Sequence, residues 1–339
     1  VSMNIIIYGS SITGGVNIYT KSLYLSLKKL GYKVYLLKGI KSIGQTISIL
    51  PKFIFNKKGK FIFLTWGIYN FLPFPRKSQI CFFHGFPALR AQSFFKVLIL
   101  SASILFAKLR NLKCITISNY SKSILHDIFC LDTYVIHNSL PLFFYEKFHK
   151  NHNQMIKLEE KKIDIIYVGR VINIKIPFKV IEILELFTKQ KKEICIIGKG
   201  DSSENYQKIY PSTNIQFMGN LEHNKIEKYL KSSKVFISCS ESEPFGLVFI
   251  EALIQGCIIV CPRSGGALEI HNLLGSIADE FFIFYQNQID LPIILDKAIL
   301  KATKINQKLY KSNLKALRKK LLEIFSPIEH SKKIIDLIN

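Results

Sequence analysis

The stretch CSESEPFGLVFIEAL, residues 239–253, contains a turn followed by the start of an apolar segment. The largely apolar residues 234–238 before it predict a buried strand, and the pattern of residues 247–254 predicts a helix. Pro244 and Gly246 lie between the two and predict a turn. A strand, a glycine turn and a helix N-terminus together direct backbone N–H groups at an anion. The stretch therefore predicts a ligand-binding loop.

Two carboxylates flank this turn. Glu243 lies in the predicted loop, and Glu251 lies about a turn and a half into the predicted helix, so both can face one ligand. A carboxylate accepts a pair of hydrogen bonds, which suits a sugar diol. A second stretch, RSGGALE at residues 263–269, repeats the strand–turn–helix pattern one unit later.

The paired motifs Glu-x7-Glu, with Pro-Phe-Gly inside it, and Gly-Gly-x-x-Glu resemble those of the retaining glycosyltransferases of family 4 (glycosyl transferases group 1). The resemblance implies an α/β protein with the GT-B fold, in which two doubly wound Rossmann-like domains face a cleft. We expect an acceptor-side domain at residues 1–150 and a nucleotide-sugar donor domain at residues 163–325. The polar residues 151–162 would link them. The final helix, residues 326–339, is expected to pack back on the first domain.

Length and charge agree with this interpretation. The chain has 339 residues, of which 48% are hydrophobic, enough for two α/β domains. Its 47 Lys and Arg against 24 Asp and Glu give a net charge of +23, which predicts an anionic partner: nucleic acid, an anionic membrane or a phosphorylated substrate. The cations are scattered and not interleaved with aromatic residues, which disfavours nucleic acid. Part of the Lys excess can also simply solvate the protein surface, or reflect the base composition of the genome.

The seven cysteines contain no Cys-x2-Cys pair, so neither a disulfide framework nor a zinc site is predicted. This usage is typical of a reducing compartment. We find no signal-peptide pattern and no run of about 18–20 apolar residues, the length of a membrane span. A cytoplasmic protein is predicted, and peripheral contact with the inner face of the plasma membrane is left open.

A glycine loop follows the first predicted strand, residues 4–8, and precedes a predicted helix at residues 17–30. It is not a P-loop, because Gly14 is not followed by Lys-Ser or Lys-Thr. It also lacks the Gly-x-Gly-x-x-Gly spacing of dinucleotide sites. The resemblance implies that Gly14 and Gly15 approach the donor diphosphate. A tight turn without a ligand is the alternative.

His84 follows the predicted strand at residues 80–83. The carboxyl end of a parallel strand is a common place for a functional side chain. The resemblance implies that His84 approaches the donor sugar and the reaction centre. A lone histidine is otherwise more often structural.

Arg170 and Lys175 bracket the turn after the predicted strand at residues 163–168. Arg offers a two-pronged donor and Lys a point charge. By resemblance, the two cations clamp the donor diphosphate and help its departure. The chain differs from the family at one place here, since Ile176 and Pro177 follow Lys175 where a glycine is usual.

The resemblance also assigns the remaining site residues. Glu243 would contact the donor sugar, and Glu251 would hold the ribose diol of the nucleotide. The loop of Gly198 and Gly200 would lie near the base. The backbone around the first turn would line the same pocket: Pro244, Phe245, Gly246 and Leu247. Asn138 keeps a family position, although His137 and Ser139 flank it where Pro and Gly are typical.

The predicted chemistry is retaining sugar transfer of the hexosyltransferase type. The chain has no Asp-x-Asp motif, so no metal and no cofactor besides the nucleotide-sugar donor are expected. By resemblance, the leaving phosphate takes the acceptor proton, so no general base is named. A glycosidase pair formed by Glu243 and Glu251 is disfavoured, because both belong to one segment beside cations that suit ionised ligands.

Residues 86–112 form an unusual segment. Apolar residues crowd positions 94–107, while cations accompany them: Arg90, Lys96, Lys108, Arg110 and Lys113. This pattern fits a helix on an anionic membrane surface. A buried helix with its Lys side chains reaching solvent is the alternative.

Together these features predict transfer from a nucleoside diphosphate sugar, with UDP favoured on family grounds. The segment and the net charge favour a lipid-linked or lipopolysaccharide- or capsule-type glycan acceptor. Two alternatives remain at this point: a non-catalytic GT-B partner subunit and a nucleotide-sugar epimerase.

Overall fold

A computed structural model of the chain describes residues 3–9, 15–38, 44, 60–72, 74–84, 94–150, 158–200, 202, 206, 208, 215–263, 265–304 and 306–338. The chain forms two compact units. The first unit comprises Val1–Lys150 and Ile324–Asn339, and the second comprises Asn151–Glu323. Each unit is built around one parallel sheet.

The first unit has a six-stranded sheet in the order β2-β1-β3-β4-β5-β6, with every neighbouring pair parallel. Its strands are β1 (Met3–Gly9), β2 (Lys33–Lys38), β3 (Lys60–Thr65), β4 (Gln79–Phe83), β5 (Lys113–Thr116) and β6 (Tyr134–Val135). Its helices are α1 (Gly15–Lys29), η1 (Gly67–Phe71), η2 (Arg76–Ser78), α3 (Phe94–Leu109), α4 (Asn119–Phe129), α5 (Leu142–Lys150) and α13 (Pro327–Ile338).

Strand β1 shows why these apolar runs become central strands. Ile5 and Ile7 pack into one hydrophobic cluster, and Ile6 and Tyr8 pack into another. Successive side chains of a strand point to opposite faces, so a continuous apolar run requires a core on both sides. The sheet accordingly carries helices on both faces.

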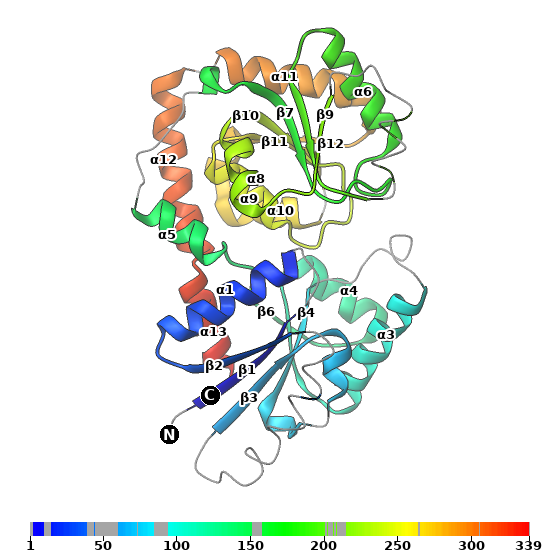
Figure 1. Cartoon of the computed structure of the whole chain (residues 1–339), viewed down its shortest axis with the longest axis vertical. Helices are drawn as coiled ribbons and strands as arrows, with labels where there is room; N and C mark the ends of the chain where they lie inside the picture. The colour runs from blue at the N-terminus through cyan, green and yellow to red at the C-terminus, as the bar shows by residue number, and fades with distance from the viewer. Residues whose placement is uncertain are drawn as a thin grey trace. The chain divides into compact units, whose positions relative to one another are not determined.

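The C-terminal helix α13 completes the core of the first unit. Ile334, Ile335 and Ile338 are buried in the same cluster as Leu23 and Leu27 of α1. In Figure 1, α13 (red) lies beside α1 (blue), and the two helices are in contact. The last residues of the chain therefore stabilise the unit that its first residues begin.

The second unit has a six-stranded sheet in the order β12-β11-β10-β7-β8-β9, again with every pair parallel. Its strands are β7 (Ile163–Val168), β8 (Ile194–Ile197), β9 (Ile215–Gly219), β10 (Ser233–Ile237), β11 (Ile258–Pro262) and β12 (Phe282–Tyr285). Its helices are η4 (Leu158–Glu160), α6 (Phe178–Lys189), α8 (His223–Lys231), α9 (Leu247–Ile254), α10 (Gly265–Leu274), η5 (Gly275–Glu280), η6 (Gln288–Asp290), α11 (Leu291–Lys304) and α12 (Gln307–Ile324).

The two sheets confirm the predicted α/β class with two doubly wound halves. In the second unit, β7 lies between β8 and β10, so the strand order reverses beside β7. This is the strand order of dinucleotide-binding folds, in which ligands bind beyond the carboxyl ends of the strands at the reversal. The topology therefore points to the loops that follow β7 and β10.

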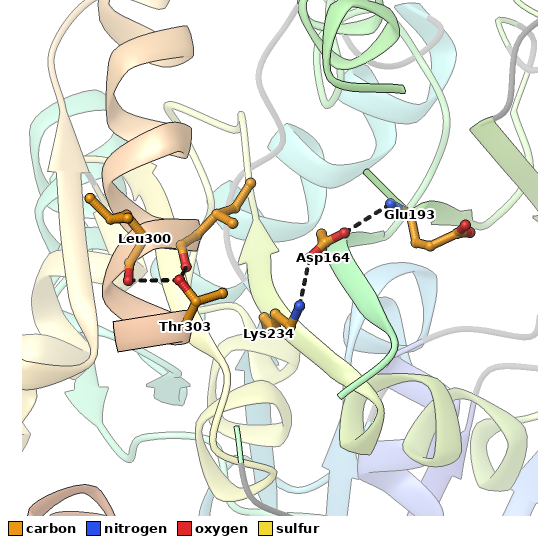
Figure 2. A network of polar contacts seen from close by, with 6 residues as sticks. Asp164, Glu193, Lys234, Leu300 and Thr303 are labelled. Atoms are coloured by element: carbon orange, nitrogen blue, oxygen red, sulfur yellow. Dashed lines mark hydrogen bonds and ion pairs between the residues drawn. The ribbon is translucent and has the colours of Figure 1, made fainter. Parts of the chain in front are cut away.

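A polar network fixes the opposite ends of these strands (Figure 2). Asp164 of β7 accepts a hydrogen bond of 2.7 Å from Lys234 of β10 and one of 3.0 Å from the backbone N–H of Glu193. Asp164 is buried, so its charge requires these partners. Since three neighbouring strands share one carboxylate, their relative register is held where they begin.

Candidate functional site

The candidate site lies at the carboxyl ends of β7 and β10. β7 ends at Val168 and is followed by Gly169 and Arg170, and β10 ends at Ile237, just before the stretch quoted first. The two strands are parallel neighbours. Their following loops therefore begin side by side, although the sequence places them far apart.

Lys175 joins the two loops. Its Nζ donates to Glu243 Oε2 at 2.7 Å and to Ser240 Oγ at 2.8 Å. The side chains of Lys175 and Glu243 are only 18% and 27% exposed, so solvent screens their attraction incompletely. The structure thus brings together two residues that the sequence assigned to one site, and it adds the buried Ser240, whose hydroxyl carried no distinctive signal.

Arg170 is placed differently. Its side chain is exposed, while its carbonyl oxygen accepts a hydrogen bond of 2.9 Å from the buried Tyr167 hydroxyl. This contact fixes the backbone of the turn after β7 and leaves the guanidinium at the surface of the loop.

Gly246 determines where helix α9 begins. It is the N-cap residue with φ of 81°, in the left-handed region that favours glycine. A Cβ atom there would lie 2.4 Å from Cδ2 of the Phe249 ring. Only glycine therefore allows the chain to turn from Glu243 into α9 within so few residues.

The second glycine turn lies directly on the first. The N–H of Gly266 donates to the carbonyl oxygen of Glu243 at 2.7 Å. A Cβ at Gly265 would lie 2.5 Å from that oxygen, and one at Gly266 would lie 2.2 Å from the Phe245 oxygen. The two motifs that repeat in sequence are thus one interlocked structure, which fixes the backbone that carries the Glu243 side chain.

The loop after β8 packs on the loop after β7 in a similar way. A Cβ at Gly198 would lie 1.7 Å from the Gly169 oxygen, and one at Gly200 would lie 2.2 Å from the Val171 oxygen. Both predicted glycines are therefore required for backbone contact between these loops.

Glu251, the second predicted carboxylate, has a different partner. It is 4% exposed, and its Oε1 lies 3.1 Å from His223 Nε2. Burial alone would lower the pKa of His223, but the charges of Glu251 and Glu227 outweigh it and raise that pKa above its ordinary value. His223 was not predicted, because one histidine at a helix start has no distinctive sequence pattern.

In the first unit, Gly15 begins α1, and a Cβ there would meet nothing within 4 Å among the described residues. Gly14 lies outside the described residues, as do Gly85 and Arg90. A contact of this loop with a diphosphate therefore stays a prediction.

His84 follows β4 and is enclosed by aromatic rings. Its centroid lies 4.7 Å from that of Tyr19 and 5.7 Å from that of Trp66. Burial, and then the charge of His330, lower the pKa of His84 to about 4, so its ring is neutral at pH 7. Its buried Nε2 has no hydrogen-bond partner within the described part of the chain. A neutral, unpaired ring nitrogen suits a hydrogen bond to a substrate hydroxyl.

A hydrogen-bonded chain supports this enclosure. His330 Nδ1 lies 2.9 Å from the carbonyl oxygen of His137, and His330 Nε2 lies 2.9 Å from the Tyr19 hydroxyl. A carbonyl only accepts, so Nδ1 carries the proton and Nε2 accepts from Tyr19. Burial lowers the pKa of His330 to about 4, in agreement with this neutral tautomer.

The chain is similar to known glycosyltransferases in sequence and in fold. Residues 149–301 match the family model of glycosyl transferases group 1. A sulfoquinovosyl transferase of Arabidopsis thaliana, SQD2, is 33% identical over 114 residues, which are 33% of this chain and 22% of that protein. The chain therefore spans about a fifth of the length of that curated relative.

Two solved structures have the same architecture over the whole chain. WaaG, a glycosyltransferase involved in lipopolysaccharide biosynthesis, covers 99% of both chains with a TM-score of 0.67 and 12% identity. Anabaena HepE, in complex with UDP, covers 100% of this chain and 99% of its own with a TM-score of 0.64 and 13% identity. The fold is thus GT-B. The predicted resemblance to glycosyl transferases group 1 is confirmed by the match over the second unit.

Proposed function

We propose that this protein is a retaining, metal-independent glycosyltransferase of the hexosyltransferase type, with a UDP-sugar as donor and a glycan as acceptor. The observation that carries the proposal is the contact of Lys175 with Glu243 and Ser240 where the strand order reverses. An ammonium group has three donors, and these two contacts leave one for a phosphate oxygen. The group that would bind the leaving diphosphate is thereby held in place.

The proposed roles of the other residues are those that the family resemblance implies. Arg170 and Lys175 would stabilise the growing charge of the leaving diphosphate, together with the first N–H groups of α9. Glu243 would bind hydroxyls of the donor sugar, Glu251 the ribose diol, and His84 a substrate hydroxyl. Glu243 faces the Lys175 ammonium group and Glu251 faces the His223 imidazole, and such partners suit a hydrogen-bond acceptor better than a proton donor.

The comparisons and the net charge support the proposed nucleotide and acceptor. HepE, which shares the fold, was solved with UDP, and WaaG acts in lipopolysaccharide biosynthesis. The net charge of +23 favours an acceptor associated with an anionic surface. A lipid-linked or lipopolysaccharide- or capsule-type glycan fits these features.

Helix α3 supports peripheral attachment to the inner face of the plasma membrane. One face packs into the first unit through Ile104 and Ala107. The other face exposes large apolar side chains: Phe94 (76%), Phe95 (73%), Leu98 (52%), Ile99 (42%), Leu105 (47%) and Leu109 (86%). We refer to these six residues as the α3 apolar face. An apolar stripe of this kind can insert into the boundary between headgroups and acyl chains.

The cations near α3 contribute less than the sequence suggested. Lys108 donates to the Phe129 carbonyl, Lys113 to that of Leu337, and Arg110 to that of Phe74. These side chains stabilise the first unit itself, so the α3 apolar face carries the membrane proposal. No helix in the described part of the chain is both long and apolar enough to cross a bilayer.

Calorimetric titration tests the donor site. UDP, GDP, ADP and CMP would be titrated without metal against the wild type and Lys175→Ala. We expect one diphosphate to bind and the variant to bind it about tenfold or more weakly, because charge-assisted hydrogen bonds are lost. Lys301→Ala is the matched control, since it removes another Lys–Glu pair of the second unit. Absence of binding, or equal binding by Lys175→Ala, would contradict the proposal.

A further inference from the structure

His223 and Glu251 form a pair between two adjacent helices. His223 is the first residue of α8, Glu251 is the fifth of α9, and the two helices are in contact. The His223 and Glu251 side chains are 18% and 6% exposed. A carboxylate this deeply buried requires a charged or hydrogen-bonding partner.

A second buried carboxylate lies on the same helix as His223. Glu227, one turn along α8, is also buried, and its Oε1 accepts from Gln255 Nε2 at 3.3 Å. The charges of both Glu251 and Glu227 act on His223. A protonated His223 would therefore offset the charge of two buried carboxylates.

Two strands that pack on α8 do not supply this charge. They are β7 and β10, whose charged residues are Asp164 and Lys234. These two pair with each other at 2.7 Å, as Figure 2 shows. Among the described residues, His223 is the basic side chain that pairs with Glu251, at 3.1 Å.

We infer that His223 is a positioning residue that holds the Glu251 carboxylate in the orientation needed to bind the ribose diol of the donor nucleotide. The inference rests on the proposed function, in which Glu251 binds that diol. His223 Nε2 lies 3.1 Å from Oε1, and a carboxylate has about four lone-pair sites, so one such contact leaves sites with which Glu251 could accept from two hydroxyls. Fixing the rotamer in advance removes its entropy cost from binding.

A chemical double-mutant cycle tests the inference. UDP, or the diphosphate that the titration ranks first, and its 2′,3′-dideoxy analogue are titrated against the wild type and His223→Ala. We expect His223→Ala to weaken diphosphate binding about tenfold and to change binding of the dideoxy analogue less than about twofold, because only the former presents a diol. Retained affinity for the analogue also shows that the variant site is folded.

Two further variants sharpen the test. His223→Gln keeps an N–H donor without the charge and should recover part of the loss, and it replaces His223→Ala should that variant not fold. His271→Ala is the control, because His271 forms another histidine–carboxylate pair of the second unit, with the exposed Asp279 at 2.8 Å. It should bind both ligands as the wild type does.

The pH profile gives an independent readout. His223 has a pKa raised above its ordinary value of about 6.5. As the pH rises through the raised pKa of His223, the imidazolium loses its proton. The ratio of diphosphate affinity to dideoxy-analogue affinity should therefore fall in the wild type. It should stay level in His223→Gln. The phosphates of the two ligands titrate alike and cancel from the ratio.

The possible outcomes distinguish failure of the positioning role of His223 from failure of the proposed function. Equal losses for both ligands, or none for either, in His223→Ala would overturn the positioning role while leaving the donor site intact. No binding of any diphosphate by the wild type would overturn the proposed function and this inference with it.

Discussion

Lys175 and Glu243 are 68 residues apart, and their charged atoms lie 2.7 Å from each other. Neither residue defines a site alone, since lysine and glutamate are common on protein surfaces. Their partial burial beside Ser240 distinguishes this pair from ordinary surface ion pairs.

Lys161 is a residue whose role the sequence did not show. It lies in the polar segment expected to link the domains, yet it is 3% exposed. Its Nζ donates to the carbonyls of Ser233, Gln255 and Gly256, beside the C-terminus of α9, and Arg318 Nε donates to that of Ile254. Cations at this helix end are favoured by the helix dipole. They help to fix the helix that carries Glu251.

The buried histidines predict that acid destabilises the first unit. His84 and His330 both have a pKa of about 4 in the folded protein, compared with about 6.5 when unfolded. Between these values the unfolded state binds protons that the folded state does not, so stability falls as the pH is lowered from about 6.5 to 4. Each group accounts for about 3 kcal/mol at most.

Urea unfolding at pH 7 and pH 5 checks this expectation. Trp66 is the single tryptophan and lies in the core of the first unit, so its fluorescence reports that unit. His330→Gln should lose less stability between the two pH values than the wild type, because one titrating group is absent. An identical loss in both proteins would show that His330 does not contribute.

At the scale of elements, the α3 apolar face predicts membrane attachment. Replacing Phe94, Leu98 and Leu105 with Ser should abolish most of the flotation with vesicles of anionic phospholipid, because each apolar side chain buried in lipid contributes about 1.5–3 kcal/mol. Folding should be retained, since these side chains are exposed.

Helix α11 of the second unit and the residues before it offer a matched control. Ile289, Ile293 and Leu300 are 74%, 75% and 51% exposed, so together they are at least as exposed as the three α3 residues. Their replacement with Ser removes similar apolar area elsewhere, so flotation should remain unchanged. Equal effects of the two triple variants would indicate nonspecific adsorption through exposed apolar side chains and would contradict a role for α3.

At the scale of the whole molecule, both ends of the chain belong to the first unit. Ile334→Ala in α13 should therefore lower the free energy of unfolding reported by Trp66 by about 2–5 kcal/mol, the usual cost of a buried Ile truncation. Asp336→Ala, an exposed change in the same helix, should cost little. If the loss of stability appeared only in signals from the second unit, α13 would not pack on the first unit.

Much of the fold followed from the sequence. Apolar runs bounded by glycine turns predicted the strands, and the helix at residues 247–254 is confirmed at the same bounds. The final helix, expected at residues 326–339, is α13, which begins at Pro327, as the fixed φ of proline allows at a first helical position. These features are local, so periodicity and turn chemistry are enough to predict them.

The candidate site was only partly predictable. Glu243, Glu251 and the glycines were predicted as site residues because they stand in motifs with fixed spacing. Ser240 and His223 were missed, since their importance depends on which side chain lies opposite. A motif records residues along the chain and not the partners that folding brings to them.

The sequence by itself determined the α/β class, the glycine turns and the family resemblance, because each depends on residues close together in the chain. Only the tertiary structure decided the pairs Lys175–Glu243, His223–Glu251 and Tyr19–His330, the last of which spans 311 positions. Strand order decides which loops and helices become neighbours, and strand order results from packing between distant segments. No local pattern encodes it, so these contacts emerge only when the sheets form.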